Sequence, residues 1–194
     1  MGNGSVASAL AGLQFVQFIQ NEADILDVIK QTVVVNMSFG TPIHLRALDI
    51  ATEQLYDSNV LMVASAGNTG SYACNHFPAG FNHVMAVAAS THEDTLAPFS
   101  NHGSCVNLVA PGANITSVWN RETTDLITLS GTSAAAAHVT GVAALVLSQL
   151  PEVKPHGLLS MLKSMALALE SLDMKPRTTT LLLNMAKLVR DSEQ

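Results

Sequence analysis

Four short segments dominated by apolar residues constrain the fold of this chain more than any other feature. They are bounded by glycine, proline and asparagine and cover residues 33–38, 60–65, 84–89 and 106–110. A strand with one face in water alternates apolar and polar side chains, whereas a strand covered on both faces is apolar nearly throughout. Helical spacing of apolar residues appears at 5–20 and at 43–56. The pattern predicts an α/β fold: a mostly parallel sheet with helices on both faces.

A long apolar segment, residues 134–150, predicts a helix buried in the protein core. It is at the short limit for crossing a bilayer and carries His138, Ser148 and Gln149, so we expect no membrane span. The helix should begin near Ser133 and end before Pro151, because proline cannot continue a helix. A short strand at 127–130 and two amphipathic helices complete the prediction, the helices at 156–171 and 182–190.

Composition and charge limit the function classes. The chain has 194 residues, of which 48% are hydrophobic and 12% charged, enough to build a large core in one domain. Its net charge of −6 argues against nucleic acid as a partner. The histidines are scattered, so no metal or other cofactor is expected. Cys74 and Cys105 allow one bridge or two free thiols. Residues 1–5 lack the features of a signal peptide.

Two segments carry residues suited to chemistry on a carbonyl group. Ser133 lies at the start of the predicted buried helix, where backbone N–H groups are free and the helix dipole is positive. Asn68 follows a predicted strand, at the carboxyl edge where α/β proteins place their sites. A serine beside N–H groups and an amide could attack a carbonyl and hold the oxyanion that forms. Taken singly, each segment is better explained without chemistry, the serine segment as a helix cap and Asn68 as an ordinary turn residue.

The order of five motifs resembles the subtilisin-like serine proteases, or subtilases. The similarity runs from about Gly4 to about Val189, and the motifs are Val35–Gly40, Ala66–Asn68, Phe99–Gly103, Ala110–Gly112 and Gly131–Ser133. The resemblance implies one subtilase-like domain over residues 1–194 that lacks the N-terminal third of the family's catalytic domain. It also implies a serine endopeptidase that forms an acyl-enzyme on Ser133, outside the cell or in the secretory pathway.

The resemblance assigns roles position by position. Ser133 matches the nucleophile and Asn68 the oxyanion-hole amide. The residues matched to substrate binding are Ser38, Phe39 and Gly40 on an edge strand, Ser65, Ala66 and Gly67 on one wall of the P1 pocket, and Gly131 and Thr132 before the nucleophile. His138 matches a structural position. Five helical residues after Ser133, it points about 140° away and is not expected to act as the base.

The family's aspartate and histidine motifs are absent from these 194 residues, since neither Asp-Thr-Gly nor His-Gly-Thr-His occurs. A serine hydroxyl without a base is a weak nucleophile, so we expect the chain alone to be inactive. The family's first strands cover one side of the buried helix. Without them, Val139, Val142, Leu145 and Val146 are expected to lose neighbours.

Three interpretations follow. In the first, the chain is part of an active peptidase, whose partners are a peptide or protein substrate and an N-terminal segment or propeptide. In the second, it is an inactive pseudoprotease that binds extended peptides in the substrate groove by strand addition. In the third, it is a non-peptidase α/β protein, or a structural piece that works only with another chain.

Overall fold

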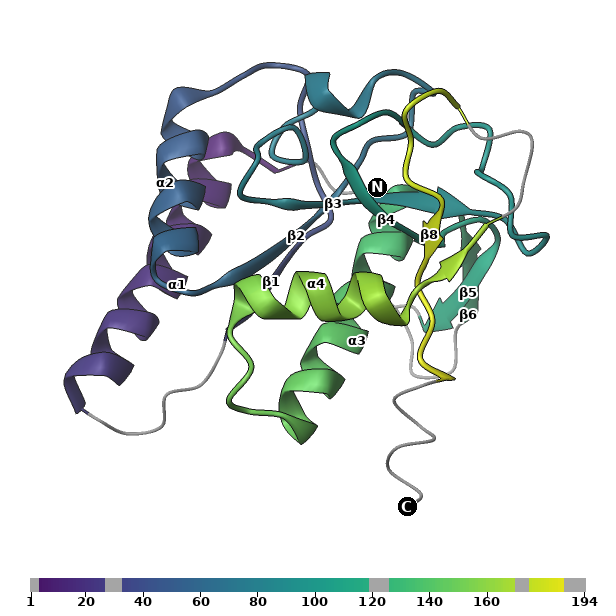
Figure 1. The fold of residues 1–194 in the computed structure, drawn as a ribbon. Coiled ribbons are helices and arrows are strands. Elements are labelled where there is room, and N and C mark those ends of the chain that lie inside the picture. Colours follow the sequence, from purple (N-terminus) through teal and green to yellow (C-terminus); the bar gives the residue numbers. More distant parts are fainter. Residues whose placement is uncertain (1–3, 27–32, 119–125, 170–174, 187–194) are drawn as a thin grey trace.

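The computed structural model describes residues 4–26, 33–118, 126–169 and 175–186 (Figure 1). The helices are α1 (Val6–Leu26), α2 (Arg46–Asp57), the short 3-10 helix η1 (Ala73–Asn75), α3 (Thr132–Gln149) and α4 (Pro155–Met165). The strands are β1 (Val34–Met37), β2 (Leu61–Ser65), β3 (Met85–Ser90), β4 (Val106–Pro111), β5 (Ile115–Val118), β6 (Leu126–Leu129), β7 (Leu167–Ala168) and β8 (Leu181–Leu182).

The main sheet has the order β1-β2-β3-β4-β8-β7. Strands β1 to β4 and β8 run parallel, and only β7 pairs antiparallel. The predicted parallel sheet is therefore confirmed, with each of its four strands found within about two residues of its expected position. Strands β5 and β6 form a separate antiparallel hairpin. The strand at 127–130 was expected, whereas its partner β5 was not.

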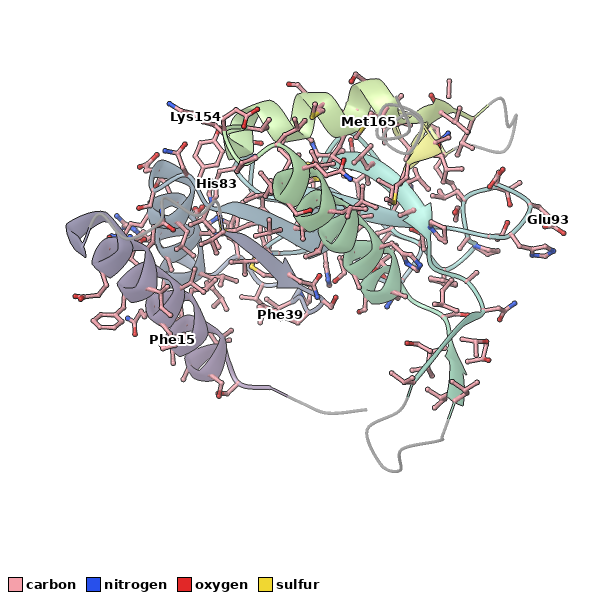
Figure 2. All side chains as sticks on the ribbon, turned by 90° about the horizontal axis from the view of Figure 1, so that it is seen from below. Phe15, Phe39, His83, Glu93, Lys154 and Met165 are labelled. Atoms are coloured by element: carbon pink, nitrogen blue, oxygen red, sulfur yellow. A yellow bond between two sulfur atoms is a disulfide. The ribbon has the colours of Figure 1, made fainter. Side chains whose placement is uncertain are left out.

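Helices cover both faces of the sheet because successive strand residues point to opposite sides. Val63 of β2 packs in one apolar cluster with α3 and α4, and its neighbour Met62 packs in a second cluster with α1 and α2. Burying each large apolar side chain contributes roughly 1.5–3 kcal/mol. Figure 2 shows α3 crossing the strands on one face. The expected helices on both faces are confirmed.

Strand β1 differs from the expectation of a strand buried on both faces. It is the edge strand of the sheet and pairs only with β2 within the described residues. The side chain of Asn36 is consequently exposed, and of the four residues in β1 only Met37 is buried. One side of the β1 backbone is thus left without a neighbouring strand.

Helix α3 is buried as predicted, but its packing corrects one expectation. Val139, Val142 and Val146 lie in the core against the sheet, and only Leu145, at 40% exposure, lacks close cover. The three valines share the face of α3 that meets the strands, whereas Leu145 flanks that face and borders an apolar groove beside the β5–β6 hairpin. In the part of the chain that is described, no helix is long and apolar enough to span a membrane.

The C-terminal helix predictions were partly wrong. Helix α4 ends at Met165 rather than at 171, and the segment expected to begin a helix at 182 instead forms β8. Leu182 pairs with Val109 of β4 and is buried there. Tertiary pairing with the sheet overrides the local helical spacing at this point. Residues 187–190 of that prediction lie outside the described residues.

Candidate active site

The candidate nucleophile Ser133 is the second residue of α3. Its position follows from Gly131, which precedes the helix in an extended conformation and turns the chain from β6 into α3. Backbone N–H groups in the first turn of a helix have no partner within the helix, and the dipole is positive there. Ser133 itself is half-buried.

Asn68 is brought to the same place from another element. It follows β2 at the carboxyl edge of the sheet, and its Oδ1 accepts hydrogen bonds from the backbone N–H and the hydroxyl of Thr132, both at 2.8 Å. The Thr132 hydroxyl also accepts from the N–H of Gly67 at 3.1 Å. A Cβ built on Gly131 would lie 3.4 Å from Asn68 Nδ2. Among the described residues, the hydrogen bonds of the Asn68 side chain all run through Oδ1, and its NH₂ group lies beside Gly131 at the start of α3.

Ser38 joins the end of β1 to the start of α3. The Ser133 hydroxyl donates to the carbonyl oxygen of Ser38 at 3.1 Å, and the Ser38 hydroxyl donates to the carbonyl oxygen of Ser133 at 2.8 Å. A further bond runs from the hydroxyl of Thr140 to Asn36 Oδ1 at 3.2 Å. Both Ser38 and Asn68 thus meet the N-terminal turn of α3, although they come from different strands.

The remaining expected substrate-binding residues lie around these contacts. Ser65 and Ala66 are buried at the end of β2, and Gly67 follows them with a φ of +102°, a conformation that favours glycine. Phe39, at 44% exposure, and Gly40 lie beyond the end of β1 at the surface. Figure 2 shows Phe39 near the open end of β1.

His76 is a residue at this site that the sequence did not point to. A Cβ on Gly40 would overlap its imidazole, and one on Gly67 would lie 3.0 Å from it. The position results from backbone bonds between Thr41 and Phe77 at 2.9 and 2.8 Å. Burial lowers the pKa of His76 below its usual range. No local sequence pattern predicts that His76 lies against Gly40 and Gly67, because its loop meets the two glycines only in the folded chain.

Among the described residues, the Ser133 hydroxyl bonds to a carbonyl rather than to an imidazole. The histidine–carboxylate pairs lie elsewhere: Asp49 contacts His44 at 3.3 Å and His83 at 3.9 Å, and His92 contacts Glu93 at 3.6 Å. His138 Nδ1 lies 2.9 Å from the carbonyl oxygen of Ala134. Within the described ranges, no cluster of His, Cys, Asp or Glu side chains could hold a metal ion.

A disulfide settles the choice that the sequence left open. Cys74 and Cys105 are bonded to each other, with Cα atoms 5.3 Å apart and a sequence separation of 31. Cys74 belongs to η1, and Cys105 directly precedes β4. The bridge therefore ties the loop that follows Asn68 to the loop between β3 and β4.

A family model for the subtilases matches residues 5–186. The chain belongs to the subtilase family. Among curated subtilases and related proteinases, an extracellular serine proteinase of Thermus sp. (strain Rt41A) is 41% identical over 154 residues, which are 79% of this chain and 35% of the relative. A thermostable alkaline protease of Halalkalibacterium halodurans is 37% identical over 77% of this chain and 38% of the relative.

The subtilase fold is also found in the solved structures. A crystal structure described as a cold-adapted subtilisin-like serine proteinase superposes with a TM-score of 0.81 and is 35% identical. The match covers 94% of this chain and 62% of the other protein. This chain spans about a third of the length of the Thermus and Halalkalibacterium proteinases. The resemblance read from the five motifs is therefore confirmed at the level of family and fold.

Proposed function

We propose that this chain is the nucleophile-bearing part of a subtilisin-type serine endopeptidase, in which Ser133 attacks the peptide carbonyl and forms an acyl-enzyme. The observation that carries the proposal is the convergence of Asn68 and Ser133 at the N-terminus of α3, from positions far apart in the sequence. A hydroxyl, a side-chain amide and the backbone N–H of Ser133 then surround one position, as acyl transfer requires.

Asn68 and the Ser133 backbone share the role of oxyanion binding in this proposal. Because Asn68 Oδ1 accepts from Thr132, the amide is oriented with its NH₂ group away from that contact. Nδ2 and the N–H of Ser133 would donate to the oxyanion as the tetrahedral intermediate forms. These donors are positioned before reaction, so little reorganisation is needed when charge develops.

The substrate would bind as an extended peptide along Ser38–Gly40. This segment continues β1, the edge strand, and backbone pairing with an open edge is a common way to bind peptides. The P1 side chain would enter between this segment and Ser65–Gly67. His76, which touches both glycines, would limit the depth of that pocket.

The aspartate and histidine of the reaction would be contributed by polypeptide outside these 194 residues. The two motifs do not occur in the sequence, and the Ser133 hydroxyl bonds to Ser38 instead of a base. The uncovered edge of β1 and the exposed Leu145 on α3 supply a surface where such polypeptide could pack. An apolar groove between α3 and the β5–β6 hairpin adjoins it, lined by Val118, Leu129 and Ala137 among others.

An oxidising compartment fits the proposal. The Cys74–Cys105 disulfide is of the kind that persists in secreted proteins and is rare in the cytosol. One relative is named as extracellular. We therefore propose secretion for the active form.

Fluorophosphonate labelling tests this function directly, because the probe needs a serine activated by a neighbouring base. The 194-residue chain alone should remain unlabelled and show no peptidase turnover. Addition or fusion of a polypeptide that carries Asp-Thr-Gly and His-Gly-Thr-His in a subtilase framework should produce both labelling and turnover. The Ser133→Ala variant should abolish them. Strong labelling of Ser133 in the lone chain would contradict the proposal, since a histidine within the chain would then be the base.

A second candidate function is peptide binding without cleavage. It is favoured by one observation, the bond from the Ser133 hydroxyl to the Ser38 carbonyl in the absence of a base. Failure of every complementing polypeptide to give turnover, together with binding of an extended peptide to the lone chain by calorimetry, would select this alternative.

A further inference from the structure

Asn101 occupies a buried position behind the candidate oxyanion site and is 1% exposed. It lies in the loop between β3 and β4, within the Phe99–Gly103 motif, for which the sequence alone suggests no role. Its Nδ2 donates to the carbonyl oxygen of Ala66 at 2.8 Å, and its Oδ1 accepts from the backbone N–H groups of Thr69 and Ser71, each at 3.0 Å. Its own N–H donates to the carbonyl oxygen of Gly67 at 2.9 Å.

These bonds bracket Asn68 on both sides. Ala66 and Gly67 precede it, Thr69 and Ser71 follow it, and all four give backbone groups to Asn101. The hydroxyls of Thr69 and Ser71 add bonds to Oδ1 at 3.0 and 3.4 Å. The segment from 66 to 71 is neither helix nor strand, so buried backbone groups there need partners elsewhere. The Asn101 side chain supplies three of these partners, for the Ala66 carbonyl and for the N–H groups of Thr69 and Ser71.

Gly67 shows how closely the two segments fit. A Cβ at this position would overlap Asn101 Nδ2, and the backbone has a φ of +102°. Glycine is thus required both by the backbone conformation and by the approach of the Asn101 amide. The N–H of Gly67 in turn bonds to the Thr132 hydroxyl at 3.1 Å. This bond holds the residue before Asn68 against Thr132, which Asn68 Oδ1 also contacts.

We propose that Asn101 is the positioning residue of the oxyanion amide: it fixes the Ala66–Ser71 loop so that Asn68 Oδ1 meets Thr132 and Asn68 Nδ2 faces the space in front of Ser133. The proposal rests on the function proposed above, because it concerns the same site. Asn101 does not contact the substrate itself. Asn101 acts through Asn68, because its bonds to Ala66, Thr69 and Ser71 hold the backbone on either side of Asn68 in place.

The first test uses the 194-residue chain without any complementing polypeptide. In Asn101→Ala, amide exchange at Thr69, Ser71 and Thr132 should become about tenfold faster or more, because buried donors lose their partner. The NMR signals of the Asn68 side-chain NH₂ should shift as well. Asn107→Ala is the matched control: Asn107 Oδ1 also accepts from a backbone N–H, that of Ala86 at 2.7 Å, but in β4 at a distance from the site.

The control should leave the exchange at Thr69, Ser71 and Thr132 and the Asn68 signals unchanged. Equal acceleration in both variants would overturn the proposal, since it would indicate general loss of stability. Unchanged Asn68 signals in Asn101→Ala would overturn it as well. If Asn101→Ala does not fold, Asn101→Asp carries the test. The aspartate keeps an oxygen that accepts from the N–H groups of Thr69 and Ser71, and such donors favour a carboxylate. Amide exchange at Thr69 and Ser71 should therefore stay slow, whereas the carbonyl oxygen of Ala66 loses its donor.

The second test uses the complemented enzyme. Asn101→Ala should lower kcat by a factor close to that of Asn68→Ala, with KM changed by less than about threefold. In the Asn68→Ala background, the further loss from Asn101→Ala should be under about threefold, because the group it positions is gone. Independent, multiplying losses would overturn the proposal. An inactive complemented wild type would overturn only the proposed function, because the NMR test of Asn101 does not depend on turnover.

Discussion

Ser133 and Ser38 exchange hydrogen bonds: each hydroxyl donates to the carbonyl oxygen of the other residue, at 3.1 and 2.8 Å. The candidate nucleophile thus has its proton directed at a backbone carbonyl, which cannot accept it in a reaction. The pair also fixes the end of β1 to the first turn of α3. In the proposed reaction, an imidazole that activates Ser133 would have to compete with the Ser38 carbonyl for the same hydrogen.

The Ser38 hydroxyl should contribute to stability even without catalysis. Ser38→Ala removes the bond to the Ser133 carbonyl and lowers the free energy of unfolding by about 1 kcal/mol, the usual net value of such a bond. Urea unfolding followed by circular dichroism measures the change. Ser148→Ala is the control: its hydroxyl bonds within α3 to Leu145 at an exposed position and should change stability by less than about 0.5 kcal/mol. Equal effects would contradict the prediction.

Replacement of Asn68 should separate its two functions in the complemented enzyme. Asn68→Ala should lower kcat by about 10²–10³, the loss known from removal of the oxyanion asparagine in subtilisin itself. Asn68→Asp retains an oxygen that can accept from Thr132 but offers no donor to the oxyanion. The kcat of Asn68→Asp should be no higher than that of Asn68→Ala. Its thermal stability should be higher than that of Asn68→Ala, because the bonds from Thr132 are kept. Steady-state kinetics and calorimetry check the two parts, and a kcat near wild type for Asn68→Asp would exclude the amide as donor.

Stability should increase with pH through the range where histidines titrate. Burial lowers the pKa of His76, and burial lowers that of His83 against the opposing carboxylates of Asp49, Glu53 and Asp57. The unfolded chain, with histidine pKa values near about 6.5, then binds more protons than the folded chain. The stabilisation is complete above about pH 6.5 and is lost as pH falls through the folded pKa values.

Unfolding in urea between about pH 5 and 8 measures this slope. His83→Gln should flatten it, because the titrating group is removed while a donor to Thr52 can remain. His92→Gln, at a side chain that is 83% exposed, should leave it unchanged. A slope that is the same in all three proteins would rule out His83 as a source.

Reduction of the Cys74–Cys105 bridge should destabilise the chain substantially. Closing a loop with a sequence separation of 31 restricts the unfolded state by roughly 3–4 kcal/mol on the chain-entropy account. The Cys74→Ser/Cys105→Ser double variant should lose stability of that order in thermal unfolding. The wild-type protein in a reducing agent should show the same loss, and the reducing agent should have no further effect on the double variant.

The sequence was sufficient for the sheet and the buried helix, because apolar runs and a proline stop are local signals. Motifs that follow one another in order also named Ser133 and Asn68 as candidates, and the structure brings the two to the same turn of α3. It was not sufficient for His76 and Asn101, whose roles depend on loops that meet only after folding. It was wrong where helical spacing at 182 competed with pairing to Val109, since a long-range strand partner outweighed the local preference.

The open side of β1 makes the isolated chain prone to aggregation. An uncovered strand edge is a template on which any extended chain can add, and natural proteins guard such edges with charges, prolines or bulges. The residues of β1 are Val34, Val35, Asn36 and Met37, none of which is charged or a proline. Where no other strand covers this edge, the chain should aggregate through β1 above a limiting protein concentration. Polymerisation through β1 then competes with the docking of a complementing polypeptide, so the yield of active enzyme should be highest when that polypeptide is present during folding.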